Sequence, residues 1–131
     1  KAGYTALIDF VSSYSANKKI MTLCIPGDRR DKDFESIAKI CANSIDKIVL
    51  FESYLRGLEE GELANKVKKY LIKYGMANDQ IIIIHDEKDA VQYCLDMGGE
   101  YDFVILSNYN VDDTHLKVQA HKEKLEQERS A

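Results

Sequence analysis

A continuous apolar run that ends abruptly in a charged turn constrains the fold of this chain more than any other stretch. Residues 20–25, Ile-Met-Thr-Leu-Cys-Ile, are almost entirely apolar, and Pro26 and Gly27 end the run. An unbroken apolar run bounded by turn residues is typical of a strand that is buried on both faces of a parallel sheet. The sequence therefore predicts a central strand that delivers the following loop to one edge of the sheet.

That loop carries two arginines to the start of a helix. Arg29 and Arg30 follow the turn, and apolar positions recur at helical spacing from Phe34 onward. We expect Asp31 or Asp33 to cap this helix. A helix N-terminus beside guanidinium groups attracts phosphates and carboxylates. In the alternative interpretation, the arginines only pair with neighbouring aspartates on a solvated loop.

The rest of the chain alternates helices with short apolar strands. Hydrophobic periodicity predicts further helices over residues 3–16, 34–43, 63–74 and 86–97, and strands over 47–51, 81–84 and 103–106. We expect Asp86 to cap the last of these helices and Gly75 to end the third in a left-handed turn. Such alternation predicts an α/β fold with a Rossmann-like parallel sheet, helices on both faces and the strand order 3-2-1-4.

In that strand order the ligand crevice lies between the first and fourth strands, at the edge where parallel strands end. The loops 26–33 and 107–113 meet there, which adds Asn108 to the candidate binding residues. Residues 1–113 are the predicted domain. Residues 114–131 are helix-prone but have few apolar positions, so they predict a charged helical tail that is only marginally stable.

Composition and missing motifs exclude several classes of function. The net charge of −4 argues against non-specific nucleic-acid binding, and no apolar run is long enough to cross a membrane. Three cysteines without metal-ligand spacing indicate reduced thiols in a cytoplasmic protein. The chain has no phosphate-binding glycine loop and no nucleophile elbow, so we expect no ATP binding by this chain alone, no bound metal and no catalytic residue. We interpret His85, which follows a strand, as a structural or solvent-exposed residue.

Two loops of the sequence together resemble a known family. Gly27-Asp28-Arg29-Arg30-Asp31 follows one strand, and Leu55-Arg56-Gly57 with Gly61-Glu62 follows the next. This pair of loops is similar to the C-terminal domain of cyanophycin synthetase and its Mur ligase relatives. Ala2-Gly3-Tyr4 also looks like the segment near the start of that domain. The resemblance covers residues 2–106, and a chain that starts at Lys1 in this way is expected to be a piece of a longer polypeptide.

The resemblance implies that the parent enzyme joins amino acids by ATP-dependent amide formation through an acyl phosphate. ATP and magnesium would be held mainly by an upstream ATP-binding domain of the same polypeptide, and this domain would close over an amino acid or peptide substrate. The substrate- or phosphate-binding residues carried over by position are Gly27, Asp28, Arg29, Arg30, Arg56 and Glu62. Of the two arginines, Arg30 is the one that we expect to point inward.

A second class of function fits the same residues. A stand-alone Rossmann-like binding or regulatory module could use the arginine loop to recognise an anionic ligand or a phosphorylated partner. An ATP-binding domain upstream in the same polypeptide would favour the ligase.

Overall fold

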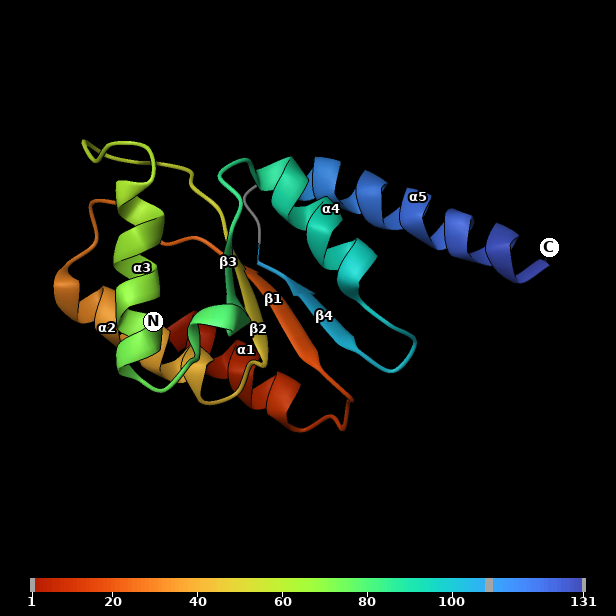
Figure 1. Ribbon diagram of the computed structural model, residues 1–131, viewed down its shortest axis with the longest axis horizontal. Helices are drawn as coiled ribbons and strands as arrows, with labels where there is room; N and C mark the ends of the chain where they lie inside the picture. The colour runs from red at the N-terminus through yellow and green to blue at the C-terminus, as the bar shows by residue number, and fades with distance from the viewer. Residues whose placement is uncertain (1, 108–109, 131) are drawn as a thin grey trace.

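The chain folds around a parallel sheet of four strands in the predicted order. The structure is a computed structural model that describes residues 2–107 and 110–130. Its strands are β1 (Lys19–Leu23), β2 (Lys47–Leu50), β3 (Ile81–Ile83) and β4 (Phe103–Leu106), and all neighbouring pairs are parallel in the order β3-β2-β1-β4 (Figure 1). The α/β class and the strand order predicted from the sequence are thus confirmed.

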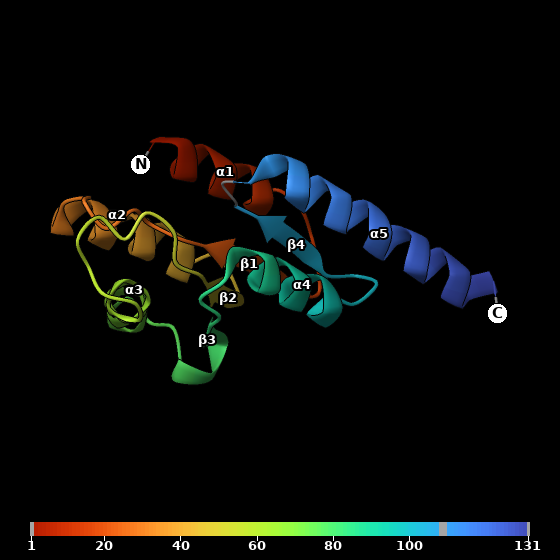
Figure 2. The same ribbon diagram turned by 90° about the horizontal axis from the view of Figure 1, so that it is seen from above.

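Helices cover both faces of the sheet, as predicted. The helices are α1 (Ala2–Ser12), α2 (Asp31–Ala42), α3 (Glu62–Lys73), the short 3-10 turn η1 (Asn78–Gln80), α4 (Glu87–Met97) and α5 (Val111–Ser130). Figure 2 shows α1, α2 and α3 on one face and α4 on the other, with α5 beside α4. This arrangement follows from right-handed crossovers between parallel strands.

The core lies between the two central strands and the helices on either side. The side chains of β1 and β2 are fully buried after the first residue of each strand. This burial explains why the sequences of both strands are almost entirely apolar. The α2 side chains that face them are Phe34, Ile37, Ala38 and Cys41. Burying one large aliphatic or aromatic side chain of this kind contributes about 1.5–3 kcal/mol.

Two predicted helix ends are confirmed and one is wrong. The Asp86 carboxylate accepts a 3.1 Å hydrogen bond from the Asp89 N–H at the start of α4, and Gly75 follows α3 with φ 111°. The residue that caps α2 is Arg30, and no side chain accepts a capping hydrogen bond there. α2 begins at Asp31, so Asp31 and Asp33 lie within its first turn and neither occupies the capping position. The Asp33 carboxylate instead accepts hydrogen bonds from the Arg30 guanidinium.

The C-terminal tail is a continuous helix that begins earlier than predicted. α5 starts at Val111 and runs for 20 residues without a buried side chain. Its start is fixed by Asn110, whose side-chain oxygen accepts a 3.1 Å hydrogen bond from Asp113 N–H and whose own N–H donates to Glu87 of α4. Among the helices of the described segments, none combines the length and the apolar character that crossing a membrane requires.

The three cysteines are buried and form no disulfide, as the sequence predicts. Cys24 follows β1, Cys41 lies on α2 and Cys94 on α4, and no disulfide joins them. Burial raises the pKa of the Cys41 and Cys94 thiols to about 12, so both remain protonated.

Candidate functional site

The loops that follow β1 and β2 contact each other directly at the edge of the sheet where the strands end. The Gly27 N–H donates a 3.0 Å hydrogen bond to the carbonyl oxygen of Tyr54. A Cβ atom on Gly27 would lie 2.0 Å from the carbonyl oxygen of Leu55, so this position has room only for glycine. The two motifs singled out in the sequence are therefore parts of one structural unit.

The second loop adopts a backbone conformation that side chains rarely occupy. Tyr54 and Arg56 have φ of 52° and 53°, and Gly57 has φ of 96°. Non-glycine residues in the left-handed region carry strain and are often found at functional sites. The Arg56 guanidinium lies over the Tyr54 ring, 5.2 Å from its centroid, which is the geometry of a cation–π contact.

A buried carboxylate that the sequence analysis missed holds this loop in place. The Glu52 side chain is 4% exposed, and its oxygens accept hydrogen bonds of 2.8 and 3.0 Å from Gly61 N–H and of 2.9 Å from Ala64 N–H. The N–H groups of the N-cap residue Gly61 and of Ala64 in the first turn of α3 thus bind a carboxylate from the end of β2. An acidic residue directly after a buried strand, ahead of a glycine and a helix, was the available sequence signal.

The same carboxylate binds a histidine from the end of β3. His85 Nδ1 lies 2.6 Å from Glu52 Oε1, and the Glu52 N–H donates a 3.0 Å hydrogen bond to the His85 carbonyl oxygen. Burial on its own would raise the pKa of Glu52. The hydrogen bonds from Ala64, Gly61 and His85 outweigh it, so that the pKa lies below its ordinary value and the group is ionised.

The arginine loop is exposed, and its two guanidinium groups differ. The Arg30 side chain is 78% exposed and pairs with Asp33 through hydrogen bonds of 3.2 and 3.4 Å. This pair raises the pKa of Arg30 and lowers the pKa of Asp33. Arg29 is also exposed, and its backbone N–H donates a 3.2 Å hydrogen bond to the Pro26 carbonyl oxygen. Its guanidinium forms no hydrogen bond or ion pair with the described residues, although its charge contributes to the lowered pKa of Asp33. Pairing on a solvated loop, the alternative interpretation from sequence, therefore describes Arg30 but not Arg29.

The remaining predicted residues have separate positions. Asp28 is exposed in the turn beside Gly27. Glu62 is the first residue of α3, and its carboxylate accepts a 3.3 Å hydrogen bond from Glu59 N–H, so it stabilises the start of its own helix. Asn108 lies outside the described residues.

Two adjoining hollows, each of about 450 Å³, open at this edge and share Ser53 and Glu87. The first is lined by Glu52, Ser53, Leu55, Glu60, His85, Asp86 and Glu87, and the second by Ser53, Tyr54, Glu87, Asn110, Val111 and Asp112. Neither Arg29 nor Arg30 lines them. Their charged lining is acidic, which suits a positively charged group better than a phosphate. In the described part of the chain no three side chains gather as metal ligands.

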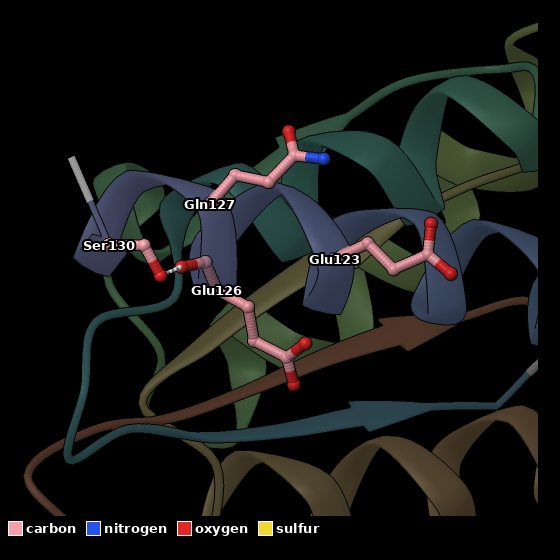
Figure 3. Close-up of a pocket in the computed structure, with 4 residues that line it drawn as sticks. All are labelled: Glu123, Glu126, Gln127 and Ser130. Carbon is pink, nitrogen blue, oxygen red and sulfur yellow. Dashed lines mark hydrogen bonds between the residues drawn. The ribbon is translucent and has the colours of Figure 1, made fainter.

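A further hollow of about 430 Å³ lies along the end of α5 and is lined by that helix alone. Figure 3 shows its lining, Glu123, Glu126, Gln127 and Ser130, all projecting from one helix. The hydrogen bond there is local, from Ser130 Oγ to the Glu126 carbonyl oxygen at 3.0 Å. Because no residue of another element lines this hollow, we do not assign it as a binding site.

Comparison with known proteins identifies relatives by sequence and by structure. No family model matches the chain. The cyanophycin synthetase of Crocosphaera subtropica is 31% identical over 106 residues, which are 80% of this chain and 12% of the relative. The cyanophycin synthetase of Synechocystis sp. is 30% identical over 122 residues, which are 92% of this chain and 14% of the relative. The chain thus spans about an eighth of the length of these curated relatives.

The fold matches a solved Mur ligase. The structure of UDP-N-acetylmuramoyl-L-alanyl-D-glutamate–2,6-diaminopimelate ligase superposes with a TM-score of 0.69 over 92% of this chain and 28% of that chain, at 13% sequence identity. At this identity the match shows the fold. Together with the sequence relatives, it confirms the resemblance of this chain to cyanophycin synthetase and its Mur ligase relatives.

Proposed function

Since the chain is related in sequence to the cyanophycin synthetases and has the fold of a Mur ligase segment, we propose that it is the C-terminal substrate-binding domain of an ATP-dependent amide ligase. The parent enzyme joins an amino acid to an amino acid or peptide substrate by way of an acyl phosphate. This domain closes over the reacting groups, and an upstream domain of the same polypeptide binds ATP.

The observation that carries this proposal is the contact between the two motif loops. The hydrogen bond from Gly27 N–H to the Tyr54 carbonyl oxygen fixes the arginine loop beside the strained loop that carries Arg56. Both lie where parallel strands end, which is the edge at which open α/β sheets bind ligands. A rigid pair of loops at that edge is suited to position a substrate against a second domain.

Among the candidate residues, Arg29 is the one whose guanidinium is available for an anion. Arg30 is already bound to Asp33, and Arg56 stacks on Tyr54. A guanidinium that contacts a phosphate or carboxylate forms a charge-assisted hydrogen bond of about twice the usual strength. We therefore assign Arg29 to the anionic groups of the reaction, with Gly27 and Asp28 setting the turn.

Among the described residues no three side chains gather as ligands that could hold a magnesium ion on this domain alone. No step of the reaction is therefore routed through a metal on this domain. In the proposed enzyme, ATP supplies the phosphoryl group that activates a carboxylate, and phosphoryl transfer depends on a phosphate cradle and a held magnesium ion. Both belong to the upstream domain.

The test compares the 131-residue chain with the longer polypeptide that contains it. We expect the longer polypeptide to release ADP and phosphate in a 1:1 ratio with amide product when ATP, magnesium and amino acids are supplied. Deletion of residues 1–131 abolishes amide formation, and the isolated chain hydrolyses no ATP.

Two results would contradict the proposal. Magnesium-dependent ATP hydrolysis by the isolated chain, lost on Gly27→Ala, would show that the chain carries its own phosphate cradle. A longer polypeptide without any ATP-binding domain would favour the stand-alone module that recognises an anionic ligand.

A further inference from the structure

The bond between Glu52 and His85 determines which ring nitrogen of the histidine carries the proton. An ionised carboxylate can only accept hydrogen bonds, and Glu52 Oε1 lies 2.6 Å from His85 Nδ1. Nδ1 must therefore donate, and in the neutral ring Nε2 carries the lone pair. In the described chain Nε2 has no partner, although the His85 side chain is 46% exposed and lines a hollow.

We propose that His85 accepts a proton from the incoming amine and that Glu52 is the residue that positions it. This proposal rests on the ligase function given above and adds a residue for one of its steps. A histidine held by a buried carboxylate is the arrangement that orients an imidazole as a base in several unrelated enzymes. Neither residue belongs to the motifs that carry the family resemblance, which are residues 27–31, 55–57 and 61–62.

The surroundings of His85 leave space for a ligand and fix the ring. Gly61 lies beside the imidazole, and a Cβ atom at that position would be 3.8 Å from His85 Cε1. The backbone hydrogen bond from Glu52 N–H to the His85 carbonyl oxygen joins the two strand ends. Carboxylates of Glu60, Asp86 and Glu87 line the same hollow, and no lysine or arginine does. Their charge favours an ammonium group over a phosphate.

The proton step balances without another reactant. A protonated amine donates an N–H hydrogen bond to His85 Nε2, and the proton moves to the ring. The amine nitrogen keeps the electron pair of that N–H bond and becomes nucleophilic. The resulting imidazolium remains beside the Glu52 carboxylate, which offsets its charge.

The experiment uses NMR on the 131-residue chain with glycinamide as the amine probe. Ring nitrogen signals of His85 near neutral pH should report a proton on Nδ1. Glu52→Gln presents an amide N–H to the ring, so the proton should move to Nε2. Glycinamide should shift the signals of His85, Ser53 and Gly61 in a saturable manner, whereas inorganic phosphate should leave them unchanged.

His85→Asn is the decisive variant, because the asparagine amide can replace the Nδ1 donor to Glu52 but has no Nε2 acceptor. We expect it to fold and to bind glycinamide about tenfold or more weakly, which is the effect of losing one charge-assisted hydrogen bond. His121→Asn, on α5, should leave the affinity unchanged. Equal glycinamide affinity of wild type and His85→Asn, or a wild-type ring protonated on Nε2, would overturn the proposal.

The measurement needs neither ATP nor another domain. Failure of the ligase proposal would therefore leave these NMR results unchanged. Conversely, glycinamide binding whose affinity does not depend on His85 would overturn the present inference and leave the ligase proposal intact.

Discussion

The Gly27 N–H donates a 3.0 Å hydrogen bond to the Tyr54 carbonyl oxygen, and this bond joins the loops after the two central strands. The next carbonyl oxygen, that of Leu55, occupies the space where a side chain on Gly27 would lie. Glycine is therefore required here by the approach of another backbone segment and not by a positive φ. The arginine loop and the loop that carries Arg56 should respond to mutation as one unit.

Gly27→Ala should destabilise the chain by about 1–3 kcal/mol or more. Its Cβ atom would lie 2.0 Å from the Leu55 oxygen, so one of the two loops must move and the Tyr54 hydrogen bond must lengthen. Overpacking of this kind costs about 1–3 kcal/mol. Urea denaturation followed by circular dichroism measures the free energy of unfolding.

Gly57 provides the matched control in the same loop region. A Cβ atom there meets nothing within 4 Å, but φ is 96°. Gly57→Ala should cost about 1–2 kcal/mol from backbone strain alone, and Gly57→Asn should cost less because asparagine tolerates positive φ. If Gly27→Ala proves no more harmful than Gly57→Asn, the close contact between the two loops is not as the structure places it.

Glu52→Gln should make the free energy of unfolding depend less steeply on pH in the acidic range. The pKa of Glu52 is lower in the folded chain than its ordinary value of 4.5, so its contribution is fully present above about pH 4.5 and is lost as pH falls through the folded value. Replacing the carboxylate also weakens the cap on α3, which should cost about 1–2 kcal/mol at neutral pH. The free energy of unfolding of wild type and variant, measured at steps of about one pH unit between about pH 3 and pH 7, gives both the change in pH dependence and the loss of stability at neutral pH.

Asp33 and Glu35 also have lowered pKa values, so they contribute to acid sensitivity in the wild type and in the variant alike. The difference between the two curves isolates Glu52. A difference that stays constant from pH 7 down to the acid limit would mean that Glu52 titrates in the folded chain as it does in the unfolded chain.

The fold was predictable from sequence because its signals are local and consistent. The unbroken apolar runs of β1 and β2 and the glycine after α3 each predict what the structure shows. The cap of α2 was predicted wrongly, because the apolar periodicity begins only at Phe34 whereas the helix begins at Asp31, which places both aspartates inside its first turn.

The site was less predictable than the fold, because it depends on contacts between distant residues. Glu52 and His85 are 33 positions apart and meet only because β2 and β3 are neighbours. The sequence shows His85 as a lone histidine after a strand, and it does not indicate that a carboxylate lies beside the ring. Similarly, Gly27 reads as a turn residue, and its close approach to Leu55 emerges only in three dimensions.

The thiols should react slowly in the folded chain. Burial raises the pKa of Cys41 and Cys94 to about 12, which leaves almost no thiolate, and Cys24 is 2% exposed with its Sγ 3.5 Å from the Ser53 carbonyl oxygen. Titration with a thiol reagent without reductant should count three free thiols in denaturant and almost none at early times in native buffer. A count of one in denaturant would reveal a disulfide and contradict the structure.

If the proposed ligase function is right, Arg29→Ala should lower the turnover of the longer polypeptide about ten- to hundredfold, which is the effect of losing a charge-assisted contact in the transition state. Sequence reasoning favours Arg30 as the inward residue, but Arg30 is bound to Asp33 and Arg29 is available. Arg30→Ala should therefore have the smaller effect on turnover. Both variants should leave the melting temperature of the isolated chain nearly unchanged, since both side chains are exposed.

Steady-state amide formation and thermal melts of both variants provide the comparison. If neither substitution changes turnover, or if both unfold the chain, the arginines are scaffold and the anion-binding role of this loop is wrong.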